Sequence, residues 1–130
     1  TAGFLSQDSQ RLSMCKQRDI KKHFITVANR FDLLHTRIPN DKKKMVRRGS
    51  KSTFVLNGKS FRISKNILHN ELLERISPIY STSANLTEKR FSYRYGYNNA
   101  DIIVSDCRGI KEDMASTIYK INRKKIKRVR

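Results

Sequence analysis

Several short stretches of the chain are runs of β-prone residues, which predicts β-strands. The stretch "HFITVA" at 23–28 is one of them, and "STFVLNGKSFRIS" at 52–64 holds two β-prone runs separated by Asn57-Gly58. Because asparagine and glycine tolerate positive φ, this pair favours a type I′ turn and therefore a β-hairpin. Further strands are predicted at 78–82, at 101–106 ("DIIVSD"), at 115–121 and at 125–130.

Helical spacing occurs between these strands. The stretch "SKNILHNELLERI" carries apolar residues at 67, 68, 72, 73 and 76, which share one helical face, and Ser64 or Asn66 is the expected N-cap. Shorter helices are predicted at 8–17, with Ser6 or Asp8 as cap, at 28–35 and at 87–95. This order predicts a mixed α/β fold with an antiparallel hairpin and disfavours a doubly wound Rossmann sheet.

The length of 130 residues and the apolar fraction of 37% suit one domain with one core. We therefore expect a single domain over residues 1–130. No stretch reaches the roughly 18 to 20 apolar residues of a spanning helix, and the N-terminal residues lack the apolar core of a signal peptide. We expect a cytoplasmic protein with no membrane partner, in which Cys15 and Cys107 are reduced and structural, since no CxxC or Cys/His spacing surrounds them.

The formal net charge of +18 is far from the balance of an average enzyme, and it predicts a polyanionic partner. The runs "DKKKMVRR" at 41–48 and "NRKKIKRVR" at 122–130 are typical of phosphate-binding strips. Solvated lysines from a generally basic proteome are the alternative interpretation. Double-stranded RNA or tRNA is the expected polyanion.

Common catalytic motifs are absent from the sequence. It contains no GxxxxGK[ST], GxGxxG, HExxH or GxSxG, and His23, His35 and His69 lie apart without metal-ligand spacing. In contrast, Ser81-Thr82-Ser83-Ala84-Asn85 offers hydroxyl and amide groups after a predicted strand and before a predicted helix. Such a segment could hold an anion at the helix N-terminus, although an ordinary turn and N-cap is the alternative.

Several polar motifs follow one another along the chain, each beside a predicted strand or turn. Lys16 and Arg18 precede the strand at 23–28, Arg62 ends the hairpin, "TSAN" follows, Ser116-Thr117 starts a strand, and "KRVR" closes the chain. Together they resemble the YrdC-like family, the threonylcarbamoyl-AMP synthases of tRNA modification. The resemblance spans nearly all of residues 1–130, without the usual first strand of the family.

The resemblance implies a twisted mixed sheet curled around an open basic cavity, with helices outside. It also implies a set of site residues. By this resemblance the catalytic residues are Lys16 and Arg18, the ATP contacts are Arg18, Lys22, Ser83, Asn85 and Arg130, and the threonine contacts are Thr1, Arg62 and Ser116.

The implied activity is L-threonylcarbamoyladenylate synthesis from L-threonine, bicarbonate and ATP, with Mg²⁺ held mainly through phosphates and with tRNA-modification proteins downstream. Threonine carbamate is already an anionic nucleophile, so this reaction needs cations and hydrogen-bond donors more than a general base. A reduced, non-catalytic relative that binds RNA or nucleotide is the alternative. A ribosome-associated basic protein is the third hypothesis.

Overall fold

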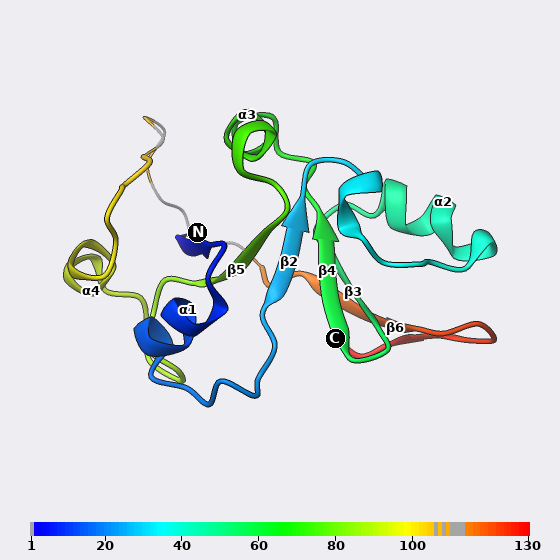
Figure 1. The fold of residues 1–130 in the computed structure, drawn as a ribbon, viewed down its shortest axis with the longest axis horizontal. Coiled ribbons are helices and arrows are strands. Elements are labelled where there is room, and N and C mark those ends of the chain that lie inside the picture. The colour runs from blue at the N-terminus through cyan, green and yellow to red at the C-terminus, as the bar shows by residue number, and fades with distance from the viewer. Residues whose placement is uncertain (1, 106, 108, 110–113) are drawn as a thin grey trace. The chain divides into compact units, whose positions relative to one another are not determined.

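The computed structural model describes residues 2–105, 107, 109 and 114–130 (Figure 1). The backbone clusters into two compact units. Unit 1 comprises Thr1–Phe24 and Tyr80–Met114, and unit 2 comprises Ile25–Ile79 and Ala115–Arg130. Each unit combines strands with helices, which confirms the predicted mixed α/β class.

Unit 1 pairs two strands and adds two helices. Strand β1 (Gly3–Ser6) runs antiparallel to β5 (Ile79–Ser83), and the helices are α1 (Ser9–Lys16) and α4 (Tyr93–Asn98). The small buried core of this unit consists of Phe4, Leu12, Phe24 and Ala84.

Helix α1 begins at the predicted position because Asp8 caps it. The Asp8 carboxylate accepts hydrogen bonds from the backbone N–H groups of Gln10 and Arg11, which satisfies two donors that the first helical turn leaves open. The helix ends at Gln17, whose left-handed φ of 46° stops the helical path. Lys16 therefore lies in the last turn of α1, and its side chain is buried.

Unit 2 contains a five-stranded mixed sheet in the order β2-β4-β3-β6-β7. Its strands are β2 (Ile25–Ala28), β3 (Ser52–Leu56), β4 (Lys59–Ile63), β6 (Thr117–Ile121) and β7 (Ile126–Arg128). The β3–β4 and β6–β7 pairs are antiparallel, whereas β2–β4 and β3–β6 are parallel. Asn57 and Gly58 have φ values of 51° and 77°, as a type I′ turn requires, so the predicted hairpin is confirmed.

The helices of unit 2 are η1 (Asp32–Leu34), α2 (Asn40–Arg48) and α3 (Ile67–Ile76). The predicted N-cap Asn66 is confirmed, since its side chain accepts from the His69 N–H. The helix expected at 28–35 is reduced to the single 3-10 turn of η1.

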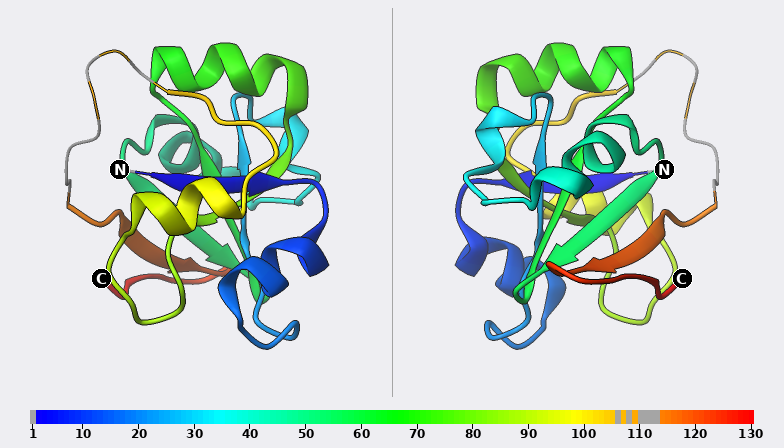
Figure 2. Two further views of the ribbon diagram at one scale, coloured as in Figure 1. Left: turned by 90° about the vertical axis from the view of Figure 1, so that its left-hand side faces the viewer. Right: turned by 90° about the vertical axis from the view of Figure 1, so that its right-hand side faces the viewer.

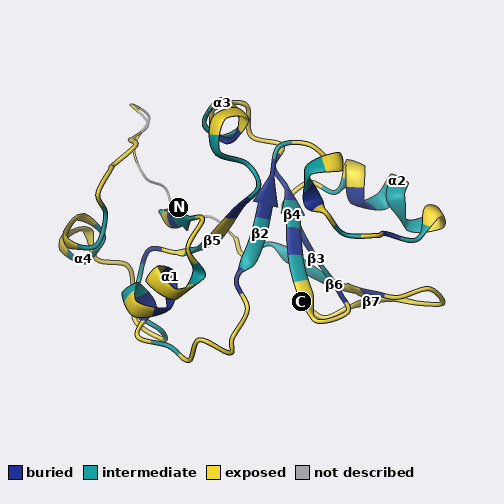
Figure 3. Cartoon of the chain, in the orientation of Figure 1, coloured by how far each residue is buried: buried dark blue, intermediate teal, exposed yellow. Residues whose placement is uncertain are grey.

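The core of unit 2 includes residues of β2, β3 and β4, and buried positions of β2 and β4 are dark blue in Figure 3. Phe54 of β3 and Phe61 of β4 are directly paired and both belong to this core. Because successive strand residues point to opposite faces, Thr53 and Arg62 project from the other face. The alternation of these two strands thus separates the apolar core from a polar site.

Two predicted elements are wrong. Residues 87–92 form turns and irregular backbone rather than a helix, and α4 starts only at Tyr93, where the Ser92 hydroxyl accepts from the Tyr95 N–H. Residues 101–105 are bends and coil rather than a strand, and residue 106 lies outside the described residues. The side chains of Ile102 and Val104 are 82% and 70% exposed, so this apolar run lacks the cover that a buried strand needs.

The helices described in residues 2–105 and 114–130 are all too short or too polar to cross a bilayer.

Candidate anion-binding sites

A buried lysine at the end of α1 organises the polar segment that follows β5. The Lys16 ammonium lies 3.0 Å from the Ser83 carbonyl oxygen, 3.3 Å from Ser83 Oγ and 3.0 Å from Asn85 Oδ1, and it also donates to the Asn85 carbonyl. One cation therefore joins residues that are 67 and 69 positions away in the sequence. We call Lys16, Ser83 and Asn85 the lysine cradle.

The lysine cradle combines a desolvated charge with an accessible hydroxyl. Burial lowers the pKa of Lys16 from its ordinary value, and the positive charge of Arg18 lowers it further. Lys16 is 4% exposed, while Ser83 belongs to the exposed residues. An anion that reached Ser83 would meet a cation whose field is weakly screened by water.

The backbone after Ser83 differs from the expected helix N-terminus. The Ala84 N–H bonds the Ala2 carbonyl, and the Asn85 N–H bonds the Ser83 carbonyl. The Asn85 amide donates to the carbonyls of Leu86 and Lys89, which holds a turn in place of a helix. The expected contribution of a helix dipole at this point is therefore wrong, and Lys16 is the positive group of the cradle.

The two other residues predicted near the cradle lie in the loop between α1 and β2. Arg18 donates to the carbonyl oxygens of Lys22 and His23 at 2.8 and 2.9 Å, and its guanidinium lies 4.3 Å from the centre of the Phe24 ring. The Arg18 side chain thus holds this loop closed, and no described hydrogen bond connects it to Ser83 or Asn85. Lys22 is exposed.

A second polar cluster lies in unit 2, on the sheet face opposite the core. Arg62 Nε and Nη2 donate to Thr53 Oγ1 at 3.2 and 2.8 Å, and Nη2 also donates to Ser116 Oγ at 2.8 Å. Thr53 and Ser116 bond each other at 3.1 Å. Arg130 donates to the Ser116 carbonyl at 3.3 and 3.2 Å, so both predicted arginines meet at Ser116.

This arginine cluster, formed by Thr53, Arg62, Ser116 and Arg130, carries positive charge without a counter-ion among the residues that the structure describes. Burial lowers the pKa of Arg62, and the charge of Arg130 contributes to the same shift. The pKa of His69 is lowered by burial and by the positive charge of Arg62. A guanidinium bonded only to hydroxyl groups is suited to an incoming carboxylate or phosphate.

The sequence prediction grouped Lys16 with Ser83 and Asn85, and Arg62 with Ser116. It assigned Arg130 to ATP, whereas the structure places Arg130 at Ser116, and it missed Thr53 and Thr87. The two-residue turn at Asn57-Gly58 pairs Phe54 with Phe61, and one further step places Thr53 opposite Arg62. Thr53 could therefore have been found by counting back from the turn. Thr87, whose hydroxyl donates to the Lys16 carbonyl at 2.9 Å, carries no sequence signal that distinguishes it. The predicted contact Thr1 lies outside the described residues.

No protein-family model, curated protein or solved structure matches this chain. The chemistry of the two clusters therefore rests on their own residues.

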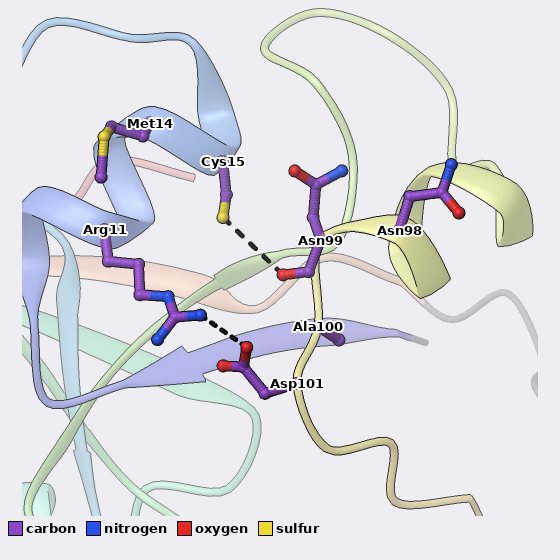
Figure 4. Close-up of a pocket in the computed structure, with 7 residues that line it drawn as sticks. All are labelled: Arg11, Met14, Cys15, Asn98, Asn99, Ala100 and Asp101. Atoms are coloured by element: carbon purple, nitrogen blue, oxygen red, sulfur yellow. Dashed lines mark hydrogen bonds and ion pairs between the residues drawn. The ribbon is translucent and has the colours of Figure 1, made fainter.

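Unit 1 also contains a cleft of about 320 Å³, which shares no lining residue with either cluster. It is lined by Arg11, Met14 and Cys15 of α1 and by residues 98–101 (Figure 4). Arg11 Nη2 lies 2.6 Å from Asp101 Oδ1, so the two charges neutralise each other. None of the predicted site residues lines this cleft.

No set of three or more His, Cys, Asp or Glu side chains is placed to hold a metal ion in the part of the chain that the structure describes. The side chains of the two clusters are cations, hydroxyls and an amide, and they do not fit a protein-held Mg²⁺.

Proposed function

We propose that this chain is an L-threonylcarbamoyladenylate synthase. The observation that carries the proposal is the lysine cradle: Lys16 belongs to one predicted motif and Ser83 and Asn85 belong to another, and the three side chains form one hydrogen-bonded group. Arg62 and Ser116, both expected at threonine, are likewise joined by a hydrogen bond, and Arg130, which was expected at ATP, donates to the Ser116 carbonyl.

The lysine cradle is assigned to the phosphate groups of ATP. Lys16 supplies a compact positive charge, and Ser83 supplies a hydroxyl donor at the exposed edge. Asn85 fixes the turn that follows, through its bonds to the Leu86 and Lys89 carbonyls at 2.8 and 2.6 Å. Because the site is built before the substrate arrives, little reorganisation is needed when negative charge develops on the phosphate.

The arginine cluster is assigned to the carboxylate of threonine. Three of the five Arg62 N–H groups bond Thr53 and Ser116, which leaves the two N–H groups of Nη1 without a described partner. A threonine carboxylate would accept from these donors and neutralise the charges of Arg62 and Arg130. The hydroxyl groups of Thr53 and Ser116 keep the guanidinium plane in a fixed orientation.

The proposed reaction balances without a protein base. The amine of threonine and bicarbonate combine to form the carbamate and water. A carbamate oxygen then forms a bond to the α-phosphorus of ATP, the bond from that phosphorus to the bridging oxygen breaks, and pyrophosphate leaves with the electron pair. When bound, Mg²⁺ would be held by phosphate oxygens and water.

The proposal is tested by pyrophosphate release from ATP with threonine and bicarbonate, and with each omitted. The expected result is release that requires both and that falls at least about tenfold in Ser83→Ala and in Arg62→Met, which corresponds to about 1.4 kcal/mol of transition-state stabilisation each. Two exposed residues outside the clusters provide controls, Ser50→Ala for the hydroxyl and Lys59→Met for the cation. Release that persists without threonine, or that falls equally in the controls, would contradict the proposal.

A non-catalytic module that binds RNA or nucleotide is the second candidate. It is favoured by the saturation of Lys16, whose three N–H donors already serve four protein oxygens. In this case Lys16 is a structural cation that shapes the segment after β5. Binding of ATP without any pyrophosphate release, in a folded chain, would support this candidate over the synthase.

A further inference from the structure

Strand β7 is the last strand of the unit 2 sheet, and one of its edges is unpaired. Among the described strands it pairs with β6 alone, and the two strands (red and orange) lie side by side in both views of Figure 2. Every residue from 122 to 130 is exposed. The free edge of β7 is therefore open to a partner outside the chain.

The hydrogen bonds that flank the β6–β7 pair show which residues of β7 turn their backbone toward β6. The Asn122 N–H donates to the Lys125 carbonyl at 3.0 Å, and the Val129 N–H donates to the Ile118 carbonyl at 2.8 Å. Hydrogen-bonded and non-hydrogen-bonded residue pairs alternate along an antiparallel ladder. The backbone groups of Lys125, Lys127 and Val129 therefore face β6.

Ile126 and Arg128 occupy the intervening positions, opposite Ile121 and Tyr119. By the same alternation their N–H and C=O groups point away from β6, toward the free edge. The edge thus offers two donors and two acceptors along a strand that is about 10 Å long. An edge with unpaired backbone groups is a template for another extended chain.

The side chains along this edge are basic around a single aliphatic residue. Lys125, Lys127 and Arg128 are exposed, and Ile126 is 42% exposed. Lys127 lies directly opposite Lys120, which is also exposed. None of the ion pairs among the described residues includes any of these cations. Opposite charges on neighbouring strands stabilise their pairing and like charges oppose it, so a partner strand that carries carboxylates fits this edge.

The backbone geometry favours a protein segment over other polyanions. Phosphate oxygens can accept from the N–H groups of Ile126 and Arg128, but they have no donor for the two carbonyls. An extended peptide satisfies both kinds of group and adds side chains at a fixed spacing. Lysine on an edge strand also discourages pairing between two copies of one chain, because both edges would carry the same charge. An acidic segment of another protein meets neither obstacle.

We propose that the basic edge, formed by Lys125, Ile126, Lys127 and Arg128, binds an extended acidic segment of a partner protein by β-strand addition. The backbone of the segment pairs with Ile126 and Arg128. Its Asp and Glu side chains lie beside the three cations, and an aliphatic side chain lies beside Ile126. No residue of the basic edge belongs to the lysine cradle or the arginine cluster, so the inference goes beyond the proposed synthase and does not depend on it.

The test titrates the full chain with a short acetylated and amidated peptide in which Asp and Glu residues flank a central valine, without ATP or threonine. Amide hydrogen exchange followed by NMR reports the strand pairing directly. The N–H groups of Ile126 and Arg128 should become protected at saturation, whereas the N–H of Lys127, which already faces β6, should change little. Saturation that leaves Ile126 and Arg128 unprotected would overturn the inference.

A second peptide separates backbone pairing from charge. It has the same sequence with N-methyl groups on two consecutive central residues. Because consecutive N–H groups point to opposite edges of a strand, this peptide cannot pair fully by either edge. Its dissociation constant for the unmodified chain, measured by fluorescence anisotropy, should be at least about tenfold higher. Equal affinities of the two peptides would show that the edge attracts charge alone and would overturn the inference.

Substitutions in the chain test the same edge. Ile126→Pro removes an outward N–H and no donor to β6, so it should weaken peptide binding at least about fivefold, whereas Ile126→Val should change it less than about twofold. Lys127→Gln should weaken binding more than Lys124→Gln, because Lys124 lies in the turn between β6 and β7.

Inorganic polyphosphate is the control for charge, and its binding should not distinguish Ile126→Pro from Ile126→Val. Equal sensitivity of polyphosphate and peptide to Ile126→Pro would contradict strand addition. Because none of these assays contains the synthase substrates, failure of the basic edge and failure of the synthase can be distinguished.

Discussion

Replacement of Lys16 by methionine is the perturbation that tests the lysine cradle most severely. Methionine keeps an unbranched apolar stem of similar length and removes the ammonium. The four oxygen contacts at Ser83 and Asn85 are lost together. The hydroxyl and carbonyl of the exposed Ser83 can turn to water, whereas the half-buried Asn85 retains two poorly hydrated oxygens.

The magnitude follows from the two Asn85 contacts. A hydrogen bond to a charged group contributes about 1.5 to 3 kcal/mol, so two such bonds amount to about 3 to 6 kcal/mol. Partial access of water to Asn85 offsets some of this loss. We therefore expect Lys16→Met to reduce the free energy of unfolding by about 2 to 4 kcal/mol.

Urea denaturation followed by far-ultraviolet circular dichroism measures this change. Lys21→Met is the control, because Lys21 is exposed in the neighbouring loop and its substitution should alter stability by no more than about 0.5 kcal/mol. If Lys16→Met also lies within about 0.5 kcal/mol of the unmodified chain, Lys16 does not hold the segment after β5 and the reasoning fails.

Three further predictions concern unit 2. Arg62→Met should raise the pKa of His69 measured by proton NMR, although not to its ordinary value, because burial is the larger cause of the shift and remains. The pKa of His69 is depressed in the folded chain, so the unfolded chain binds the proton first. The free energy of unfolding should therefore decrease as pH falls below about 6.5. A His69→Gln variant whose free energy of unfolding, measured in urea, has the same dependence on pH would exclude His69 as the cause. Gly58→Ala should cost about 1 to 2 kcal/mol in urea denaturation, because its φ of 77° is unfavourable for a residue with a Cβ although no atom lies within 4 Å of that position; a neutral effect would count against the type I′ turn.

Local sequence signals correctly predicted the elements whose structure is determined by a few neighbouring residues. The Asn57-Gly58 turn requires positive φ at two successive residues, and Asp8 and Asn66 cap the helices that follow them. These features depend on a few neighbouring residues and on little tertiary context. The sequence therefore located the hairpin and the starts of α1 and α3.

The wrong elements are those whose structure depends on distant partners. A helix at 87–95 was predicted from composition. In the structure the Asn85 amide donates to the Lys89 carbonyl, and the Thr87 hydroxyl donates to the Lys16 carbonyl. These bonds stabilise turns in place of a helix. The apolar run at 101–106 was assigned to a strand without a partner strand in view. In the described residues 101–105 no strand pairing covers it.

In the candidate sites, too, some features could be predicted from the sequence and others could not. The order of the motifs grouped Lys16 with Ser83 and Asn85, and the structure joins these residues by hydrogen bonds. Side-chain direction was not accessible in this way. Arg18, two residues from Lys16, turns to the carbonyls of its own loop, since a guanidinium can satisfy several donors on nearby backbone.

The most direct test of the proposed synthase is to identify its product. The purified chain would be incubated with ATP, threonine and ¹³C-labelled bicarbonate, and the nucleotides would be analysed by mass spectrometry. The account predicts a threonylcarbamoyl adduct of AMP that carries the label and that is absent when threonine is omitted. An intact chain that binds ATP but forms only unlabelled AMP, ADP or no product would contradict it.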